Sequence, residues 1–256
     1  MMNSVGLFEM LRHRILKEKS CGPHTSMNYL FAVFFGSSDD QGLQRFASVT
    51  QALEGTKSFE NVVFTYCPSE ALMSKFHVQS GSVVLFADFD EGRFDLPAGF
   101  SEAALCVFLE TYSWPLVTRL TALTPQARQL RKLPCLYVFM DSAGEAAADS
   151  HKCSSRWEDA QLARALLEKT LQVIGARFRG VLQVVLVDSV DDPAGVQLAQ
   201  DLGVSASELP MACVVEMAAP FNQYRSAGLS SASGLMAFVE AWASGWLEPF
   251  SPPFSS

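Results

Sequence analysis

The stretch GVSASELPMACVVEM, residues 203–217, contains the pair Leu209-Pro210 directly before an apolar run that is typical of a β-strand. Because proline has no N–H to donate to a sheet ladder, it belongs at the first residue of a strand or on an edge strand. A bond to proline is also the common place for a cis peptide, usually in a tight turn. The stretch therefore predicts a strand that begins beside Pro210 within a larger sheet.

Outward from this strand, short apolar runs alternate with segments of helical periodicity. The predicted strands lie within residues 28–37, 61–67, 81–93, 133–140 and 181–191. Helical patterns follow these runs, and the longest covers residues 156–180. This alternation of strands and helices is typical of an α/β fold.

The same order of elements occurs twice along the 256 residues. For example, FLETYSWP at 108–115 matches FVEAWASGWLEP at 238–249 in pattern. Two copies of one fold explain such ordered similarity better than chance does. We therefore expect two domains, 1–114 and 115–250, followed by a Pro/Ser tail at 251–256.

Charge and hydropathy argue against two classes of partner. The net charge is −8, whereas a nucleic-acid partner needs a basic face. No apolar run reaches the length of a membrane span, since Glu216 interrupts the best candidate. Residues 1–20 carry charges where a signal peptide would be apolar, and their helical spacing predicts an amphipathic helix that packs on a sheet. The alternative is a basic helix on a membrane surface, which Glu9 and Glu18 disfavour. We expect neither nucleic acid nor a membrane span.

Six cysteines stand at positions 21, 67, 106, 135, 153 and 213, and no two form a Cys-x-x-Cys pair. No histidine joins two of them at the spacing of a zinc site. Cys67, Cys106, Cys135 and Cys213 lie inside or beside apolar runs, where buried structural thiols are the usual case. We therefore expect neither a metal nor a cofactor.

Several motifs, taken in order, resemble the protein disulfide isomerase family, namely its tandem non-catalytic b and b′ domains. GSVVLFADFDEGR (81–93) resembles the strand and turn of the b domain, and WPLVTRLT (114–121) resembles the join between the domains. Residues 177–217 resemble the b′ core, and FVEAWASGWLEPF (238–250) resembles its last helix and exit. The resemblance covers Tyr29 to Phe250.

This resemblance implies two tandem thioredoxin-like domains, each a central mixed sheet flanked by helices. In the family a structural cis-proline faces the Cys-x-x-Cys pair, and Pro210 would be that proline here. The family carries its cysteine pairs in outer a and a′ domains, which this sequence lacks. Whether the protein is an enzyme stays open, and the chain by itself is not expected to exchange disulfides.

Cys153 is the one candidate for a catalytic residue. It precedes a predicted helix and is flanked by Lys152 and Arg156, and both features lower a thiol pKa. The alternative is an exposed loop cysteine without function. Because release of a mixed disulfide requires a second thiol, we do not assign redox catalysis to Cys153.

The resemblance also implies a shallow apolar patch for unfolded or partly folded polypeptides in the second domain. Leu120, Leu136, Tyr137 and Phe139 fall at positions of this patch, although the simpler interpretation of Leu136 and Phe139, and the one we favour, is that they are core residues. Arg128 stands where the family usually has an aromatic residue, which is a departure from the pattern.

The sequence thus predicts a redox-inactive protein disulfide isomerase-like protein that binds unfolded or partly folded polypeptides. The alternative is a fragment of a full-length isomerase: only residues 1–5 precede the first predicted helix, so we expect the first domain to lack its first strand. A calsequestrin-like calcium-binding protein is a further alternative, for which the charge of −8 is modest.

The expected location follows from the same resemblance. The family works in the lumen of the endoplasmic reticulum, where other folding factors are possible partners. This sequence shows neither a signal peptide nor a retention signal, so a chain of this sequence by itself would be cytosolic.

Overall fold

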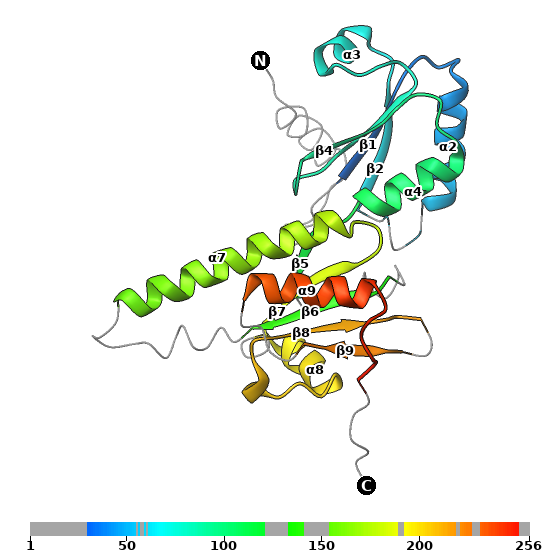
Figure 1. The fold of residues 1–256 in the computed structure, drawn as a ribbon. Coiled ribbons are helices and arrows are strands. Elements are labelled where there is room, and N and C mark those ends of the chain that lie inside the picture. Colours follow the sequence, from blue (N-terminus) through cyan, green and yellow to red (C-terminus); the bar gives the residue numbers. More distant parts are fainter. Residues whose placement is uncertain are drawn as a thin grey trace. The chain divides into compact units, whose positions relative to one another are not determined.

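The computed structural model describes residues 30–54, 56, 59, 61–120, 133–140, 154–188, 192–218, 221–226 and 231–250, with 154–163 described by their backbone. The chain divides into two compact units, Met1–Pro115 and Leu116–Ser256 (Figure 1). The boundary predicted at Trp114–Pro115 lies beside this division. Each unit is described by itself below.

The first unit contains a four-stranded sheet in the order β2-β1-β3-β4. Its elements are β1 (Leu30–Phe35), α2 (Gln41–Leu53), β2 (Val62–Cys67), α3 (Glu70–Phe76), β3 (Ser82–Phe86), β4 (Arg93–Leu96) and α4 (Glu102–Tyr112). β1 pairs with β2 in parallel, whereas β3 pairs antiparallel with both β1 and β4. The sheet is therefore mixed.

The second unit contains a five-stranded mixed sheet in the order β5-β7-β6-β8-β9. Its elements are β5 (Val117–Arg119), β6 (Cys135–Met140), α7 (Ser154–Arg177), β7 (Gln183–Asp188), α8 (Pro193–Asp201), the 3-10 helix η2 (Ala206–Glu208), β8 (Met211–Val215), β9 (Gln223–Arg225) and α9 (Ala232–Ala243). Strand for strand, β6, β7, β8 and β9 repeat β1, β2, β3 and β4. The predicted architecture, two domains that each have a central mixed sheet flanked by helices, is confirmed.

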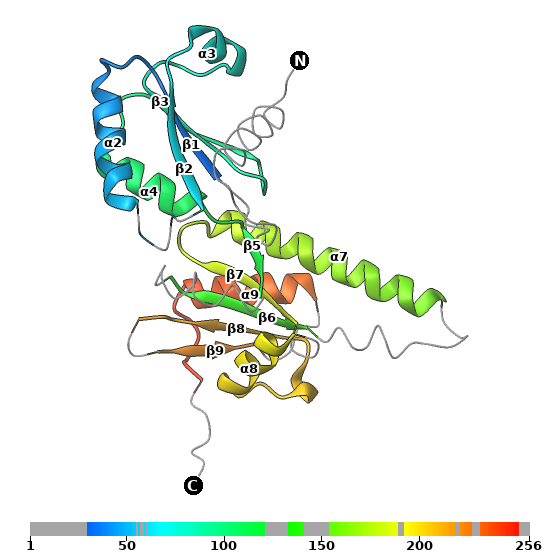
Figure 2. The same ribbon diagram turned by 180° about the vertical axis from the view of Figure 1, so that it is seen from behind.

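Each sheet separates two apolar clusters, because successive side chains of a strand point to opposite faces. In the first unit α2 and α4 pack on one face and α3 on the other. In the second unit α7 and α9 pack on one face and α8 on the other (Figure 2). β1 and β6 are buried on both faces, as their continuous apolar runs predict.

Polar side chains set where the helices begin. A side-chain oxygen accepts a hydrogen bond from a first-turn N–H and satisfies one of the donors that a helix leaves unpaired. The residues that cap helices in this way are Asp40, Ser69, Ser101, Asp192 and Ser231. The helices therefore begin at signals that stand in the sequence.

Three short strands are absent from the sequence-based prediction, namely β4, β5 and β9. Each has three or four residues and lies at or beside a sheet edge. The predicted helix within residues 1–20 lies outside the described residues. Among the described residues of the first unit, no strand corresponds to β5.

Candidate functional site

One face of the second sheet carries the candidate site, and we call it the α8-side face. Within the described ranges, α8 is the helix that packs against this face, while α7 and α9 pack against the opposite one (Figure 2). Its buried residues are Leu120, Cys135, Tyr137, Phe139, Val185, Val187, Ala199, Met211 and Cys213.

The four residues predicted to bind polypeptide divide between the two faces. Leu120, Tyr137 and Phe139 belong to the α8-side face, whereas Leu136 belongs to the cluster under α7 and α9. The cause is the alternation along β6, which sends Leu136 to the opposite side from Tyr137 and Phe139. All four are at most 5% exposed. Their role in binding stays a prediction, and the structure does not gather them on one surface.

Helix α8 rests directly on β7. The Asp192 carboxylate accepts a hydrogen bond from the Ala194 N–H at 2.8 Å, and Pro193 occupies the first turn, where its missing N–H costs nothing. Gly195 makes the close approach possible, because a β-carbon there would lie 1.7 Å from the Asp188 carbonyl oxygen. The sequence thus fixes how near α8 lies to the sheet.

Apolar side chains remain partly accessible where α8 and the strands meet. We call these half-buried residues the rim, and they are Leu198, Leu202, Val204, Leu209, Val215 and Met217. They pack against the buried residues of the α8-side face while keeping part of their surface in water. The rim therefore offers apolar surface that a second molecule can cover.

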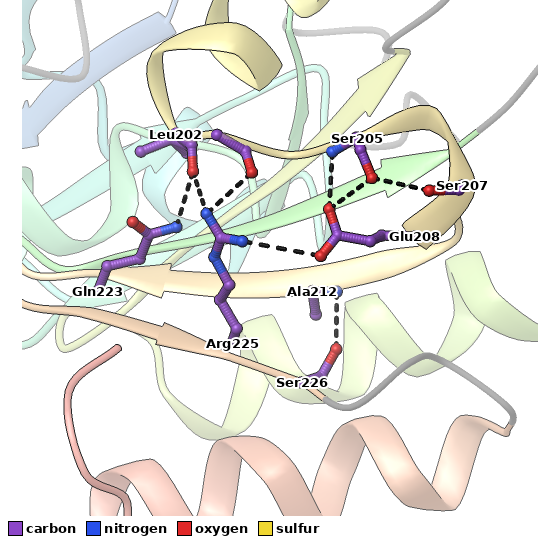
Figure 3. A network of polar contacts seen from close by, with 9 residues as sticks. Leu202, Ser205, Ser207, Glu208, Ala212, Gln223, Arg225 and Ser226 are labelled. Carbon is purple, nitrogen blue, oxygen red and sulfur yellow. Dashed lines mark hydrogen bonds and ion pairs between the residues drawn. The ribbon is translucent and has the colours of Figure 1, made fainter. Parts of the chain in front are cut away.

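Arg225, on edge strand β9, ties this strand to the end of α8 (Figure 3). Its Nη2 donates to the carbonyl of Leu202, the C-cap of α8, and to the Gly203 carbonyl at 3.1 Å. The Gln223 amide also donates to the Leu202 carbonyl, at 3.2 Å. A positive charge at this place satisfies unpaired carbonyls at the negative end of the helix dipole.

Glu208 closes the turn between α8 and β8 (Figure 3). Its carboxylate accepts from the Ser205 backbone N–H at 2.7 Å and from the Ser205 hydroxyl at 2.8 Å. These hydrogen bonds, the backbone bond first, lower the pKa of Glu208, and the nearby charge of Arg225 adds to the effect. The turn before Pro210 is thus held by an ionised carboxylate.

The residue before β8 differs from its counterpart in the first unit. The Leu209–Pro210 peptide bond is cis. The residue before β3 is Gly81, whose φ is +87° and whose N–H donates to the Phe35 carbonyl at 2.7 Å. Proline has no N–H to make that bond. Cys153, the catalytic candidate, lies outside the described residues.

The described cysteines, Cys67, Cys106, Cys135 and Cys213, form no disulfide bonds with one another. Burial raises the pKa of Cys213 to about 11. Burial also raises the pKa of Cys106, with further contributions from Glu110 and Glu102. Since the thiolate is the reactive form, neither thiol is suited to attack a disulfide near neutral pH.

Neither a metal site nor a membrane-spanning helix is found in the described ranges. No group of three or more His, Cys, Asp or Glu side chains in those ranges could hold a metal ion. No helix that the structure describes is both long enough and apolar enough to cross a membrane.

Two residues near the rim have no role in the sequence-based prediction. They are Arg225 and Phe250, whose ring centre lies 3.8 Å from the Arg225 guanidinium carbon. The single basic residue in QYR is the signal that points to Arg225. No local pattern in the sequence points to Phe250, because this residue contacts β9 only after the chain reverses direction beyond α9.

Residues 53–241 match the family model of the thioredoxin-like domain. The chain belongs to the thioredoxin-like domain family. Protein disulfide-isomerase of Humicola insolens is 23% identical to it over 224 residues, which are 86% of this chain and 39% of that protein. The chain therefore spans about two fifths of the length of this curated relative, and the resemblance to protein disulfide isomerases is confirmed.

Solved structures support the fold of this thioredoxin-like chain. The bb fragment of ERp72 superposes with a TM-score of 0.56 at 14% identity, over 93% of this chain and 96% of the fragment. The zinc-bound form of human ERp44 superposes with a TM-score of 0.51 at 14% identity, over 90% of this chain and 61% of that one. At these identities the likeness concerns the fold.

Proposed function

We propose that this chain is a redox-inactive pair of thioredoxin-like domains that binds unfolded or partly folded polypeptides through the α8-side face of its second unit. The observation that carries the proposal is the rim, a set of half-buried apolar side chains around one helix. Exposed apolar side chains are what unfolded polypeptides share, and an apolar rim recognises them without a specific sequence.

The thiol chemistry supports the redox-inactive part of the proposal. The sequence has no Cys-x-x-Cys pair, and release of a mixed disulfide depends on a second thiol. Burial at Cys213 favours the protonated thiol, which is not nucleophilic. Cys153 stays a catalytic candidate predicted from the sequence, and no redox role is assigned to it.

The resemblance to protein disulfide isomerases supports a proposal about where in the cell the chain works. We propose that the chain works in the lumen of the endoplasmic reticulum, as a participant in protein folding. A second candidate is that it forms the polypeptide-binding part of a complete disulfide isomerase. The observation that favours this candidate is that the chain spans 39% of its curated relative.

The experiment measures binding of a fluorescein-labelled, reduced and carboxymethylated α-lactalbumin by fluorescence anisotropy. A rim variant, Val204→Asp, adds one charge to the α8-side face. The matched control, Val173→Asp, adds the same charge to α7 on the opposite face, where Val173 is 52% exposed. We expect at least ten-fold weaker binding for Val204→Asp and unchanged binding for the control, with both variants folded by circular dichroism.

Equal affinities for the two variants would contradict the assignment to the α8-side face. The redox-inactive part has its own test in the reactivation of scrambled ribonuclease. We expect no rate above the glutathione background, and a rate that disappears in Cys153→Ser would overturn the proposal and make Cys153 the nucleophile.

A further inference from the structure

The chain folds back on itself after α9. The N–H of Gly245 donates to the Trp242 carbonyl and the N–H of Trp246 donates to the Ala241 carbonyl, both at 2.9 Å. Gly245 has a φ of +70°, so the two bonds form the Schellman motif that ends a helix and reverses the chain. The five residues that follow, Trp246–Phe250, form neither helix nor strand.

Phe250 meets the outer edge of the sheet. In an antiparallel pair, alternate residues direct their backbone groups to the neighbouring strand. The Asn222 carbonyl accepts from the N–H of Glu216, directly after β8, and the Ser226 N–H donates to Ala212 of β8, each at 2.9 Å. The backbone of Gln223 is therefore directed outward. The Gln223 carbonyl accepts a hydrogen bond from the Phe250 N–H at 2.5 Å. The end of this segment thus extends the sheet by one bond, as an added strand would.

The side chain of Phe250 makes a second contact with the same strand. Its ring lies over the guanidinium of Arg225, with 3.8 Å between the ring centre and Cζ. The side chain of Arg225 is 13% exposed, and its Nε is buried without a hydrogen-bond partner. The carbonyls of Leu202 and Gly203 accept hydrogen bonds from the other end of the guanidinium. These bonds orient its flat face without any contribution from the aromatic ring. A desolvated cation of this kind attracts an aromatic ring more strongly than an exposed one.

We propose that the outer edge of β9, together with Arg225, is a docking site for an extended polypeptide segment that carries an aromatic residue, and that Trp246–Phe250 occupies this site in cis. The site requires two features of its occupant: a free backbone N–H for the Gln223 carbonyl and an aromatic ring for Arg225. A partner segment with both features competes with Phe250. This proposal rests on the proposed function, because it names the kind of polypeptide segment that the second unit would bind next to its α8-side face.

The occupant is extended rather than helical for a geometric reason. Pro249 disfavours helical backbone at Glu248, and an N–H engaged within a helix is not free to bond a strand edge. Trp246, at the start of the segment, is 81% exposed and therefore adds little to the contact. One bond and one ring contact are a small interface, so a competing segment replaces Phe250 reversibly.

The test uses a fluorescein-labelled peptide with the sequence of residues 246–250, Trp-Leu-Glu-Pro-Phe, and the full chain. In the wild-type chain Phe250 competes at the high effective concentration of a tethered segment. Phe250→Ala removes this competitor, and we expect its affinity for the peptide to be at least ten-fold higher than that of the wild type. Phe221→Ala, a change at a phenylalanine that is 72% exposed, is the control and is expected to behave as wild type.

Two altered peptides separate the contacts without changing the protein. A peptide N-methylated at its phenylalanine lacks the N–H for Gln223, and a peptide with leucine in place of phenylalanine lacks the ring for Arg225. We expect each to bind Phe250→Ala at least five-fold more weakly than the parent peptide. Equal binding of all three peptides, or equal affinity of wild type and Phe250→Ala for the parent, would overturn the docking site.

The failure of this proposal can be told apart from failure of the proposed function. Peptide binding to Phe250→Ala without any binding of unfolded α-lactalbumin supports the edge site and contradicts the general binding role. Binding of α-lactalbumin that depends on Val204, together with no peptide binding to Phe250→Ala at millimolar concentration, supports the binding role and overturns the edge site.

Discussion

The two units align strand for strand, yet they cover corresponding faces differently. At the fifth residue of β3, Phe86 stands opposite Phe31 of β1, and both are at most 1% exposed. At the fifth residue of β8, Val215 stands opposite Cys135 of β6, and Val215 is only half-buried. At this end of the ladder, the face is therefore closed by two large rings in the first unit and by smaller side chains in the second. The exposure of a face therefore depends on the side chains at the paired positions and not on the pairing of the strands alone.

A second comparison concerns how each unit holds its edge strand. In the first unit Arg93 of β4 donates to the Phe76 carbonyl at the end of α3, at 2.8 Å. The matching position in β9 is Gln223, which donates to the Leu202 carbonyl at the end of α8. Both units therefore satisfy a helix end from the same strand position, and the second unit adds Arg225 to that contact.

The largest expected effect comes from removing a buried aromatic ring from the first unit. Phe86→Ala removes a fully buried ring that packs edge-on against Phe76, 6.3 Å between centroids, and we expect a loss of about 3–5 kcal/mol in the stability of the first unit. Val215→Ala at the matching position should cost the second unit about 1 kcal/mol, because fewer buried groups are lost. Hydrogen exchange read by mass spectrometry resolves the two units. Equal losses would contradict the comparison.

The next effect concerns the helix ends. Arg93→Met leaves the Phe76 carbonyl without its charged donor, and we expect a loss of about 1–3 kcal/mol in the first unit. Arg225→Met should cost the second unit less than that, because Gln223 still donates to the Leu202 carbonyl. Urea unfolding monitored by hydrogen exchange measures both. A larger loss in Arg225→Met would mean that Gln223 does not share the contact.

A smaller effect should be the same in both units. Ser101 and Ser231 each accept a hydrogen bond at 3.1 Å from the N–H three residues later, at the start of α4 and of α9. Replacement of either serine by alanine should cost about 1 kcal/mol. Thermal unfolding of the two variants checks this, and a difference well beyond that size would show that the two last helices are not equivalent.

The smallest effect is a dependence on pH that is specific to the second unit. The pKa of Glu208 is lower in the folded chain than the ordinary value of 4.5. The stabilisation from this carboxylate is therefore complete above that value and is lost as the pH falls through the lowered pKa. Glu208→Gln should flatten the acid limb of the unfolding curve of the second unit between pH 5 and the lowest pH tested. An unchanged limb would show that the Ser205 contacts do not persist in solution.

The long buried strands follow from the sequence, whereas the edges do not. Continuous apolar runs identify β1, β6 and β7 because burial on both faces requires apolar side chains at every position. The short strands RFDL, VTR and QYR mix polar and apolar residues, and their pairing is decided by neighbours distant in the chain. Local pattern carries no information about those neighbours.

The candidate site shows the same division. Alternation along β6 is sufficient to place Tyr137 and Phe139 on one face and Leu136 on the other, although the resemblance to the family groups all three. The contact of Arg225 with Phe250 depends on the reversal at Gly245, and the two residues are too far apart in the chain for a local pattern to link them. Such a contact becomes visible only in three dimensions.

The close approach of α8 to the sheet at Gly195 has a consequence for how this chain can evolve. A β-carbon there would overlap the Asp188 carbonyl, so any other residue lifts the first turn of α8. The rim residues themselves can drift among apolar types, and we expect each such change to alter the proposed binding only gradually. A single codon change at position 195, by contrast, would alter the whole surface at once while leaving every residue that lines it unchanged, and we expect selection to tolerate only glycine there.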